Sequence, residues 1–556
     1  MTLPARTRIP SHRGLFVLLR RLRAPLALLI IAYAIAVWGF TLMPGQTPDG
    51  KPWQMSFFHA FYVVSIIGTT IGLGEVPYAF SDAQRQWCIF AIYLTVIAWL
   101  YAIGVLFATL QDPQLRRVLA ESRFAARVRA QRQPFWLLCG YDDAGVRVAR
   151  ELSEAGMQLV LVDNDALRVD AIDVDQLPLA IPALHADAID PHALLLAGIA
   201  HPRCAGVIAL TGSDAVNINI ALAARLLKPD STVICGARLH SRQAEMAVAG
   251  ADHIINPFDT FAERLAHAIQ MPSLLVIYEA LTTQSGTAMA EVKVPPRGRW
   301  IVCGYGRFGR TVHRHLQRIG IEVTVIEERP QANAPDGHVA RSPTEAAAWR
   351  EAGIDKAQAV CICGGSDTEN LLAVLQAHQL NPGVFIAARQ NQRRHAPMFD
   401  AAPITLRALS GHVLAAEVLR IIRAPQLSYF LRLARQQDED WANALLQRMR
   451  RLVGAHIVEV WSLRLSPAEA PSVVAALRAG RALRIRDLLA APEDRALRLE
   501  AVPLLLQRAK DKLLLPADDD ALAEGDRLLV CGRDVAEWQM RRTAAETGAQ
   551  RIPLAV

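Results

Sequence analysis

Apolar and polar positions divide the chain into an apolar N-terminal part and a longer part in which short apolar runs alternate with charged stretches. No charged residue occurs in residues 24–48 or in residues 86–111. About 20 residues of helix rise roughly 30 Å and cross a bilayer, so each run is long enough to span a membrane. We predict transmembrane helices at about residues 24–43 and 86–110.

A third apolar stretch, residues 53–68, lies between the two crossings and is too short to span a membrane. It suits a re-entrant pore helix, and it leads into the sequence Thr69-Thr70-Ile71-Gly72-Leu73-Gly74-Glu75. Glycines that alternate with bulkier residues allow successive carbonyl groups to point toward one axis. Such a row of carbonyls can replace the hydration shell of a K⁺ ion.

Basic residues flank the two crossings unequally. Six arginines precede residue 24, another six lie in residues 116–132, and the loop between the crossings holds only Lys51 and Arg85. Because positive charge favours the cytoplasmic side, we predict a multi-pass protein of the cell membrane with both termini in the cytoplasm.

The polar part of the chain contains an internal repeat. Each copy has an apolar strand, a glycine turn and a second strand that ends in an acid. The first glycine and the acid are Gly140 and Asp163 in one copy and Gly304 and Glu327 in the other, a spacing of 163 − 140 = 23 and 327 − 304 = 23 residues. This pattern is typical of a dinucleotide-binding Rossmann fold.

These motifs resemble a known family. The segment after the pore helix resembles the potassium-channel signature T-T-V-G-Y-G-D, and the repeat is similar to tandem RCK (TrkA-N) domains. The resemblance implies a K⁺ selectivity filter formed by Thr70, Ile71, Gly72, Leu73, Gly74 and Glu75. One filter segment per chain implies a homotetramer, because the carbonyl cage needs four such segments.

The same resemblance gives the predicted fold class and domains. We expect a membrane α-helical pore, followed by α/β tandem Rossmann-like domains and a small α+β C-terminal lobe similar to TrkA-C. The predicted domains are a pore (1–110), a linker (111–133), a first RCK domain with crossover helices (134–290), a second RCK domain (298–452) and the lobe (453–556). Gly104, in the second crossing, is either a gating hinge or a packing contact.

The two copies differ at their glycine turns. The second turn matches G-x-G-x-x-G, and we predict that Gly304, Gly306, Gly309 and Glu327 bind an adenine nucleotide such as NAD or ADP. In the first copy Asp142 replaces the middle glycine, although Gly140, Gly145, Asp163 and Asp187 are retained. The first copy therefore binds a cation such as Ca²⁺ near Asp142, Asp163 and Asp187, or a nucleotide through a bridging cation, or no ligand.

Net charge and cysteine content exclude some classes of function. The net charge is only +7, which argues against a nucleic-acid partner, and eight cysteines without a C-x-x-C pair exclude a disulfide scaffold. We predict a ligand-gated potassium channel, not an enzyme, whose partners are the lipid bilayer and a small regulatory molecule. The alternatives are a weakly selective cation channel, favoured by Leu73 where the signature has Tyr, and a membrane-anchored NAD-dependent oxidoreductase, for which the sequence shows no acid–base set.

Overall fold

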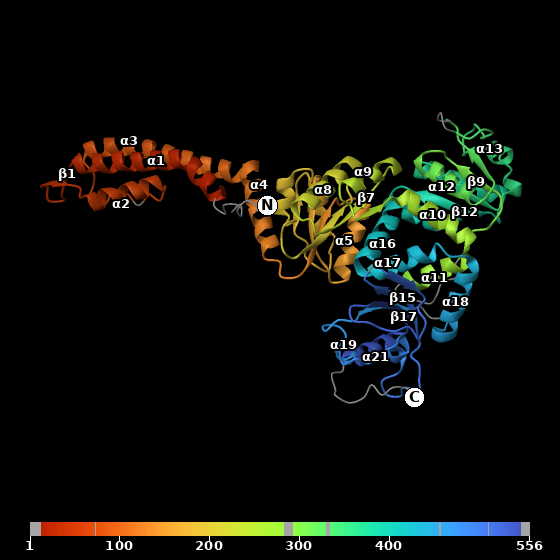
Figure 1. Cartoon of the computed structure of the whole chain (residues 1–556). Helices are drawn as coiled ribbons and strands as arrows, with labels where there is room; N and C mark the ends of the chain where they lie inside the picture. The colour runs from red at the N-terminus through yellow and green to blue at the C-terminus, as the bar shows by residue number, and fades with distance from the viewer. Residues whose placement is uncertain are drawn as a thin grey trace. The chain divides into compact units, whose positions relative to one another are not determined.

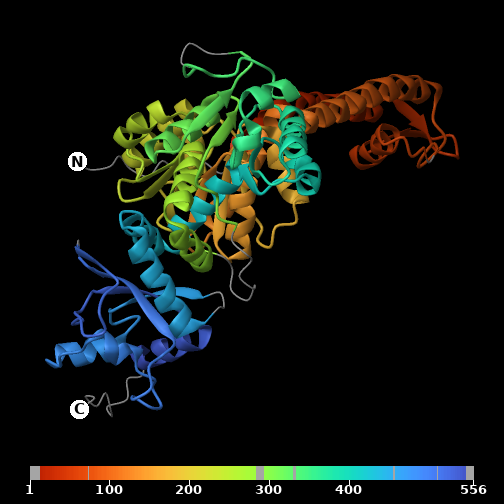
Figure 2. The same ribbon diagram turned by 90° about the vertical axis from the view of Figure 1, so that its right-hand side faces the viewer.

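The computed structural model of the chain describes residues 13–72, 74–282, 293–329, 334–454, 458–509 and 511–545. These residues form two compact units that divide between Gln131 and Arg132, which we call the N-terminal and C-terminal units. Figures 1 and 2 show their helices and strands in two views.

The N-terminal unit is helical. Its helices are α1 (Arg13–Leu42), α2 (Phe57–Gly68), α3 (Asp82–Gln111) and α4 (Pro113–Arg129). Two segments, Leu22–Leu42 and Asp82–Thr109, are long and apolar enough to cross a membrane, as predicted.

Close contact between α1 and α3 depends on a glycine. A Cβ atom on Gly39 would lie 1.9 Å from the indole ring of Trp87, so no larger residue fits there without movement. The same indole donates a hydrogen bond to the carbonyl oxygen of Ala36 over 3.0 Å. These contacts between Trp87 and the α1 residues Ala36 and Gly39 hold α1 close against α3.

The predicted helix at residues 53–68 is wrong at its start. Residues Pro52–Gln54 form strand β2, which pairs antiparallel with β1 (Pro44–Gln46). Helix α2 begins only at Phe57, because the Ser56 hydroxyl accepts a hydrogen bond from the His59 N–H and caps the helix.

The C-terminal unit begins with the first repeat, a parallel sheet in the order β5-β4-β3-β6-β7-β8. Its central strands are almost continuously buried, as expected for a parallel sheet covered by helices on both faces. The strands are β3 (Phe135–Cys139), β4 (Gln158–Asp163), β5 (Ala183–His185), β6 (Cys204–Ala209), β7 (Thr232–Gly236) and β8 (His253–Ile255). The helices are α5 (Asp143–Glu154), α6 (Ala166–Val174), α7 (Pro191–Leu196), α8 (Asp214–Leu227), η1 (His240–Arg242) and α9 (Gln243–Val248).

The second repeat is a parallel sheet in the order β10-β9-β11-β12-β13. An isolated bridge from Val339 to Ile326 marks the place that β5 has in the first repeat. The strands are β9 (Trp300–Cys303), β10 (Val323–Ile326), β11 (Ala359–Ile362), β12 (Phe385–Gln390) and β13 (Leu406–Leu409). The helices are α12 (Arg307–Arg318), α13 (Ala346–Glu351), η2 (Ile354–Lys356), α14 (Asp367–Leu380), η3 (Arg393–His395) and α15 (Ala396–Ala401).

Each repeat sends a helix onto the other repeat (Figure 1). Helix α10 (Pro257–Gln270) follows the first sheet but packs on α12 of the second repeat, where Phe261 and Leu265 join its core. Helix α16 (Ser410–Arg423) follows the second sheet but packs on α5, where Val418 joins the core of the first repeat. The two repeats are therefore joined by a reciprocal exchange of helices.

A third core ties the C-terminal lobe to these helices. Helix α11 (Pro272–Thr282) packs on α18 (Glu439–Val453), and both join a cluster that includes Val502 and Leu504 of the lobe. The lobe has an antiparallel sheet in the order β14-β17-β15-β16. Its elements are β14 (Glu459–Arg464), α19 (Pro471–Arg478), α20 (Ile485–Leu489), β15 (Ala501–Arg508), β16 (Asp511–Leu514), β17 (Arg527–Gly532) and α21 (Asp534–Ala545), and α17 (Pro425–Ala434) leads into α18. The predicted fold class is confirmed.

Candidate functional site

The predicted filter segment has an unusual backbone. Thr70, Gly72 and Gly74 have φ angles of 60°, 64° and 88°, all in the left-handed region. Side chains rarely adopt this region, and a β-branched residue such as Thr70 does so only when its surroundings impose it. Every second residue of the segment thus has a left-handed backbone conformation. Leu73, a predicted filter residue, lies outside the described residues.

The last residue of the segment, Glu75, is held by an ion pair. The Glu75 carboxylate accepts hydrogen bonds from the Arg85 guanidinium at 2.9 and 3.2 Å and from the Phe80 N–H at 2.8 Å. A cavity of about 350 Å³ lies beside the segment and is lined by Gly72, Gly74, Glu75 and neighbouring residues of α2 and α3. Glu75 therefore anchors one end of the segment to α3.

Gly104 lies inside α3, which continues for seven residues beyond it to Gln111. A Cβ atom on Gly104 would meet nothing within 4 Å in this chain. Packing against the described part of the same chain thus gives no reason for a glycine there.

Both glycine turns of the C-terminal unit have the geometry that the Rossmann motif requires. Gly140 and Gly304 have φ angles of 103° and 90°. A Cβ atom on Gly145 or Gly309 would lie 2.2 or 1.9 Å from the carbonyl oxygen of Gly140 or Gly304, respectively. The first glycine thus forms the tight turn, and the last one allows the helix to approach the strand.

The acid at the end of the second strand has the same contact in both repeats. Asp163 accepts a hydrogen bond from the Tyr141 N–H over 2.6 Å, and Glu327 accepts one from the Tyr305 N–H over 2.6 Å. The equal spacing in the sequence therefore reflects the same link between the glycine turn and the second strand.

The two repeats differ at the middle position of the glycine turn. The Asp142 carboxylate caps α5, accepting hydrogen bonds from the Ala144 and Gly145 N–H groups at 3.1 and 3.3 Å. Burial raises the pKa of Asp142 above its ordinary value. Gly306 is the corresponding cap of α12, makes no side-chain hydrogen bond, and has open space where a side chain would begin.

The carboxylates predicted to hold a cation are engaged elsewhere. Asp142 caps its helix, Asp163 binds the Tyr141 and Asp165 N–H groups, and the exposed Asp187 accepts from the Ile189 N–H over 2.9 Å. Across the described part of the chain, no group of three or more His, Cys, Asp and Glu residues is placed to hold a metal ion. The structure therefore gives the calcium prediction no support.

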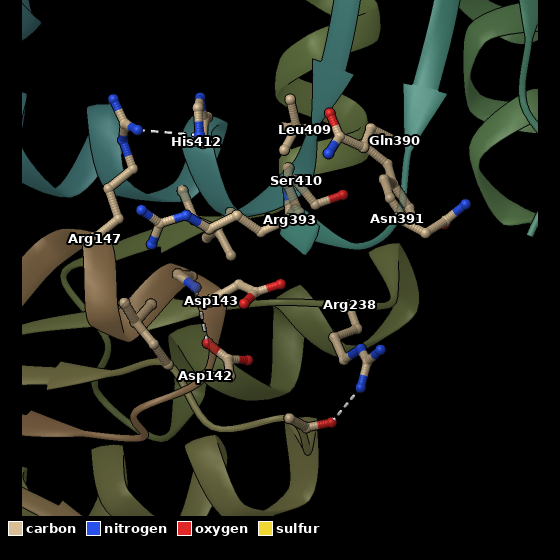
Figure 3. A pocket seen from close by; sticks show the side chains of 18 of the residues that line it. Asp142, Asp143, Arg147, Arg238, Gln390, Asn391, Arg393, Leu409, Ser410 and His412 are labelled. Carbon is tan, nitrogen blue, oxygen red and sulfur yellow. Dashed lines mark hydrogen bonds between the residues drawn. The ribbon is translucent and has the colours of Figure 1, made fainter. Parts of the chain in front are cut away.

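A cavity of about 630 Å³ lies between the two repeats, and Asp142 and Asp143 of the first glycine turn are among its lining residues. Its walls come from the length of α5, the ends of β6, β7 and β12, and the start of α16 (Figure 3). The arginines that line it are Arg147, Arg150, Arg238, Arg389 and Arg393.

Two family profiles match the sequence. The profile described as TrkA-N domain matches residues 136–257 and 300–407, and the profile described as ion channel matches residues 26–112. The two stretches of the first correspond to the two repeats, and the second contains the predicted filter segment.

Relatives and solved structures agree with these matches. Potassium channel protein 1 of Methanocaldococcus jannaschii is 25% identical over 258 residues, which cover 46% of this chain and 73% of the relative. The structure described as the GsuK channel bound to NAD covers 96% of this chain and 100% of that chain, with a TM-score of 0.50 and 18% identity. A second structure, the GsuK channel, covers 96% and 99%, with a TM-score of 0.51 and 17% identity. At these identities the two structures establish a shared fold.

Proposed function

Because the chain belongs to the potassium channels that carry TrkA-N (RCK) domains, we propose that it forms a tetrameric K⁺ pore gated by an adenine nucleotide bound to the second repeat. The proposal of a pore rests on the positive φ angles at Thr70, Gly72 and Gly74. A backbone that alternates in this way can turn successive carbonyl oxygens toward one side, as a dehydrated K⁺ ion requires.

A tetramer is proposed because one chain supplies only one of the four segments that a filter needs. Thr70, Ile71, Gly72 and Gly74 are exposed in the single chain, with Ile71 at 64% exposure, and the chain carries one such segment. A carbonyl cage around one axis needs four segments, so four copies are required to complete it. Exposed aromatic residues on α2, among them Phe57 and Phe58, supply apolar surface for neighbouring copies and lipid.

The excess of arginines before α1 and after α3 supports a cytoplasmic position for both termini and for the RCK domains. A ligand there can open or close the pore only if it binds more tightly to one state of the RCK assembly.

The nucleotide is assigned to the second repeat because of Gly306. The first N–H groups of α12 meet no side-chain cap there, and a helix N-terminus with free N–H groups attracts a pyrophosphate. Glu327 lies at the end of the adjacent strand, where a carboxylate can accept hydrogen bonds from ribose hydroxyls. A solved structure with this fold is described as bound to NAD, which favours NAD as the first ligand to test.

The pore is tested by a matched pair of glycine variants in liposomes. Gly72→Ala forces a side chain into the left-handed region, which costs about 1 kcal/mol, and should abolish Rb⁺ uptake while the protein still forms tetramers. Gly50→Ala introduces the same strain, since Gly50 has φ 76° and open space, but it lies in the turn between β1 and β2 and should keep full uptake.

Uptake that survives in Gly72→Ala would contradict the filter assignment. Reversal potentials in mixed K⁺ and Na⁺ separate a strict K⁺ channel from a weakly selective cation channel. Addition of NAD to the cytoplasmic side should change the uptake rate, and hydride transfer assayed in parallel would reveal the oxidoreductase alternative.

A further inference from the structure

Positive charge in this chain is concentrated next to the two crossing helices. Residues 1–23 hold six arginines and no acid, and residues 112–133 hold six arginines and two acids, so together they carry 6 + 6 − 2 = +10. Because the whole chain carries only +7, the remainder is net negative, at 7 − 10 = −3. The charge excess therefore belongs to these two segments and not to the rest of the chain.

Helix α4 contains most of the second segment and begins close to the membrane. The candidate span in α3 ends at Thr109, and α4 starts at Pro113. Asp112 between them has an extended backbone, with φ −62° and ψ 120°, so α4 takes a new direction instead of continuing α3. Helix α4 packs on α1 and α3 at the end of these helices that is remote from α2 (Figure 1). Its first turn therefore lies where lipid headgroups meet water.

Helix α4 has a buried apolar side and an open basic side. Phe124 and Val128, four residues apart, are only 1% and 2% exposed, so they hold the helix against the protein. Arg123 and Arg127 have the same spacing, share a different face of the helix and are exposed. The buried pair thus fixes the helix in an orientation that leaves the two guanidinium groups accessible.

The exposed arginines beside the membrane largely lack acidic partners. Arg117 pairs with Glu121 over 3.0 Å, one helical turn away. Arg23 of α1, Arg123 and Arg127 are exposed and form no ion pair with any described residue. A planar guanidinium binds a phosphate group through two parallel hydrogen bonds, so these unpaired groups are suited to phosphate.

We propose that α4 and the start of α1 form a docking surface for anionic phospholipid headgroups, with Arg123 and Arg127 as its phosphate-binding residues. The inference rests on the proposed membrane orientation, in which this end of the crossing helices is cytoplasmic. A lipid surface is the partner because clusters of arginines that directly follow a crossing lie within reach of the negative headgroup potential. Arginines also direct membrane insertion, but that role ends with insertion and does not require exposed, unpaired side chains beside a buried helix face.

The docking surface is linked to the pore by the chain itself. Helix α4 joins α3 to β3, the first strand of the first repeat, so a movement of the C-terminal unit reaches α3 through α4. Lipid bound to α4 favours the position of this helix that keeps its arginines at the membrane. Anionic lipid therefore changes the balance between the open and the closed pore.

Native mass spectrometry of the full-length protein in detergent measures lipid binding independently of ion flux. The probes are phosphatidylglycerol, which is anionic, and phosphatidylcholine, which is zwitterionic. Each arginine near a lipid surface contributes about fivefold in affinity, so Arg123→Gln with Arg127→Gln should weaken phosphatidylglycerol binding by about 25-fold. The control pair, Arg318→Gln with Arg394→Gln, removes the same charge from two exposed arginines of the second repeat and should leave binding unchanged.

The two lipids and the two pairs of variants decide the matter. Phosphatidylglycerol binding that falls in the α4 pair and stays in the control pair supports the surface. No preference of the wild type for phosphatidylglycerol over phosphatidylcholine, or equal losses in the two pairs, overturns it.

Rb⁺ uptake into liposomes tests the link to the pore. The uptake rate should depend on the phosphatidylglycerol fraction in the wild type and should lose this dependence in Arg123→Gln with Arg127→Gln. The same dependence in both proteins overturns the link. Absence of Rb⁺ uptake in every lipid, with phosphatidylglycerol binding intact, contradicts the proposed function and leaves the docking surface standing.

Discussion

The contrast between Asp142 and Gly306 makes a quantitative prediction. If the carboxylate of the first repeat excludes a pyrophosphate, Gly306→Asp should exclude NAD from the second repeat. The backbone accepts the change, since Gly306 has φ −68° and nothing lies within 4 Å of the added Cβ. Asp in place of Gly at a helix cap changes stability by only roughly a few tenths of a kcal/mol, so the protein should fold normally.

The expected loss of affinity is large. A unit charge about 4 Å from another contributes about 4 kcal/mol at an effective dielectric of 20, and the new carboxylate also occupies the N–H groups that the phosphate needs. Since about 1.4 kcal/mol is a factor of ten, NAD should bind at least about 100-fold more weakly. Titration calorimetry on the full-length protein measures this directly.

Gly306→Asn is the matched control for charge, because it has nearly the same shape and can also cap α12. It should bind NAD more tightly than Gly306→Asp does. Unchanged NAD affinity in Gly306→Asp, with an unchanged melting temperature, would refute the electrostatic reasoning and the assignment of the nucleotide to this turn.

Four further predictions follow from the packing and the buried groups. Because burial raises the folded pKa of Asp142, the stability tied to its protonated form is present at low pH and lost as pH rises through that pKa; Asp142→Asn should therefore flatten the fall in melting temperature as pH rises above the ordinary pKa of an aspartate. Seven of the eight cysteines are buried, so thiol titration of the native protein should find at most Cys88, and the full number should appear only after denaturation. Gly39→Val should disrupt the contact with Trp87 and lower the yield of folded protein in detergent, which size-exclusion chromatography measures. Gly104→Ala should change open probability in single-channel records, with unchanged gating contradicting a hinge at that position.

The sequence was sufficient to predict those elements that depend only on residues close together in the chain. An uncharged run of membrane length and a glycine turn followed 23 residues later by an acid depend on a few neighbouring residues, so the pattern suffices. The start of α2 was predicted too early because Trp53 is as apolar as the helix that follows. Only the pairing of Pro52–Gln54 with a distant strand and the cap at Ser56 reveal the boundary.

The role of Asp142 shows the same limit. Its charge alone suggested a cation site, whereas its two hydrogen bonds to N–H groups show a helix cap. The meeting of the two repeats at this cavity could not be predicted, since lining residues such as Arg238 and Arg389 lie more than 150 residues apart in the chain.

The exchange of α10 and α16 has a practical consequence. A fragment that stops after α11 would leave the apolar face of α10, with Phe261 and Leu265, facing water, and would leave α5 without the cover of Val418. Neither half can then be treated as an autonomous folding module, and co-expression of the two halves should rescue each by mutual complementation. Melting of the C-terminal unit is accordingly expected as a single cooperative transition rather than two.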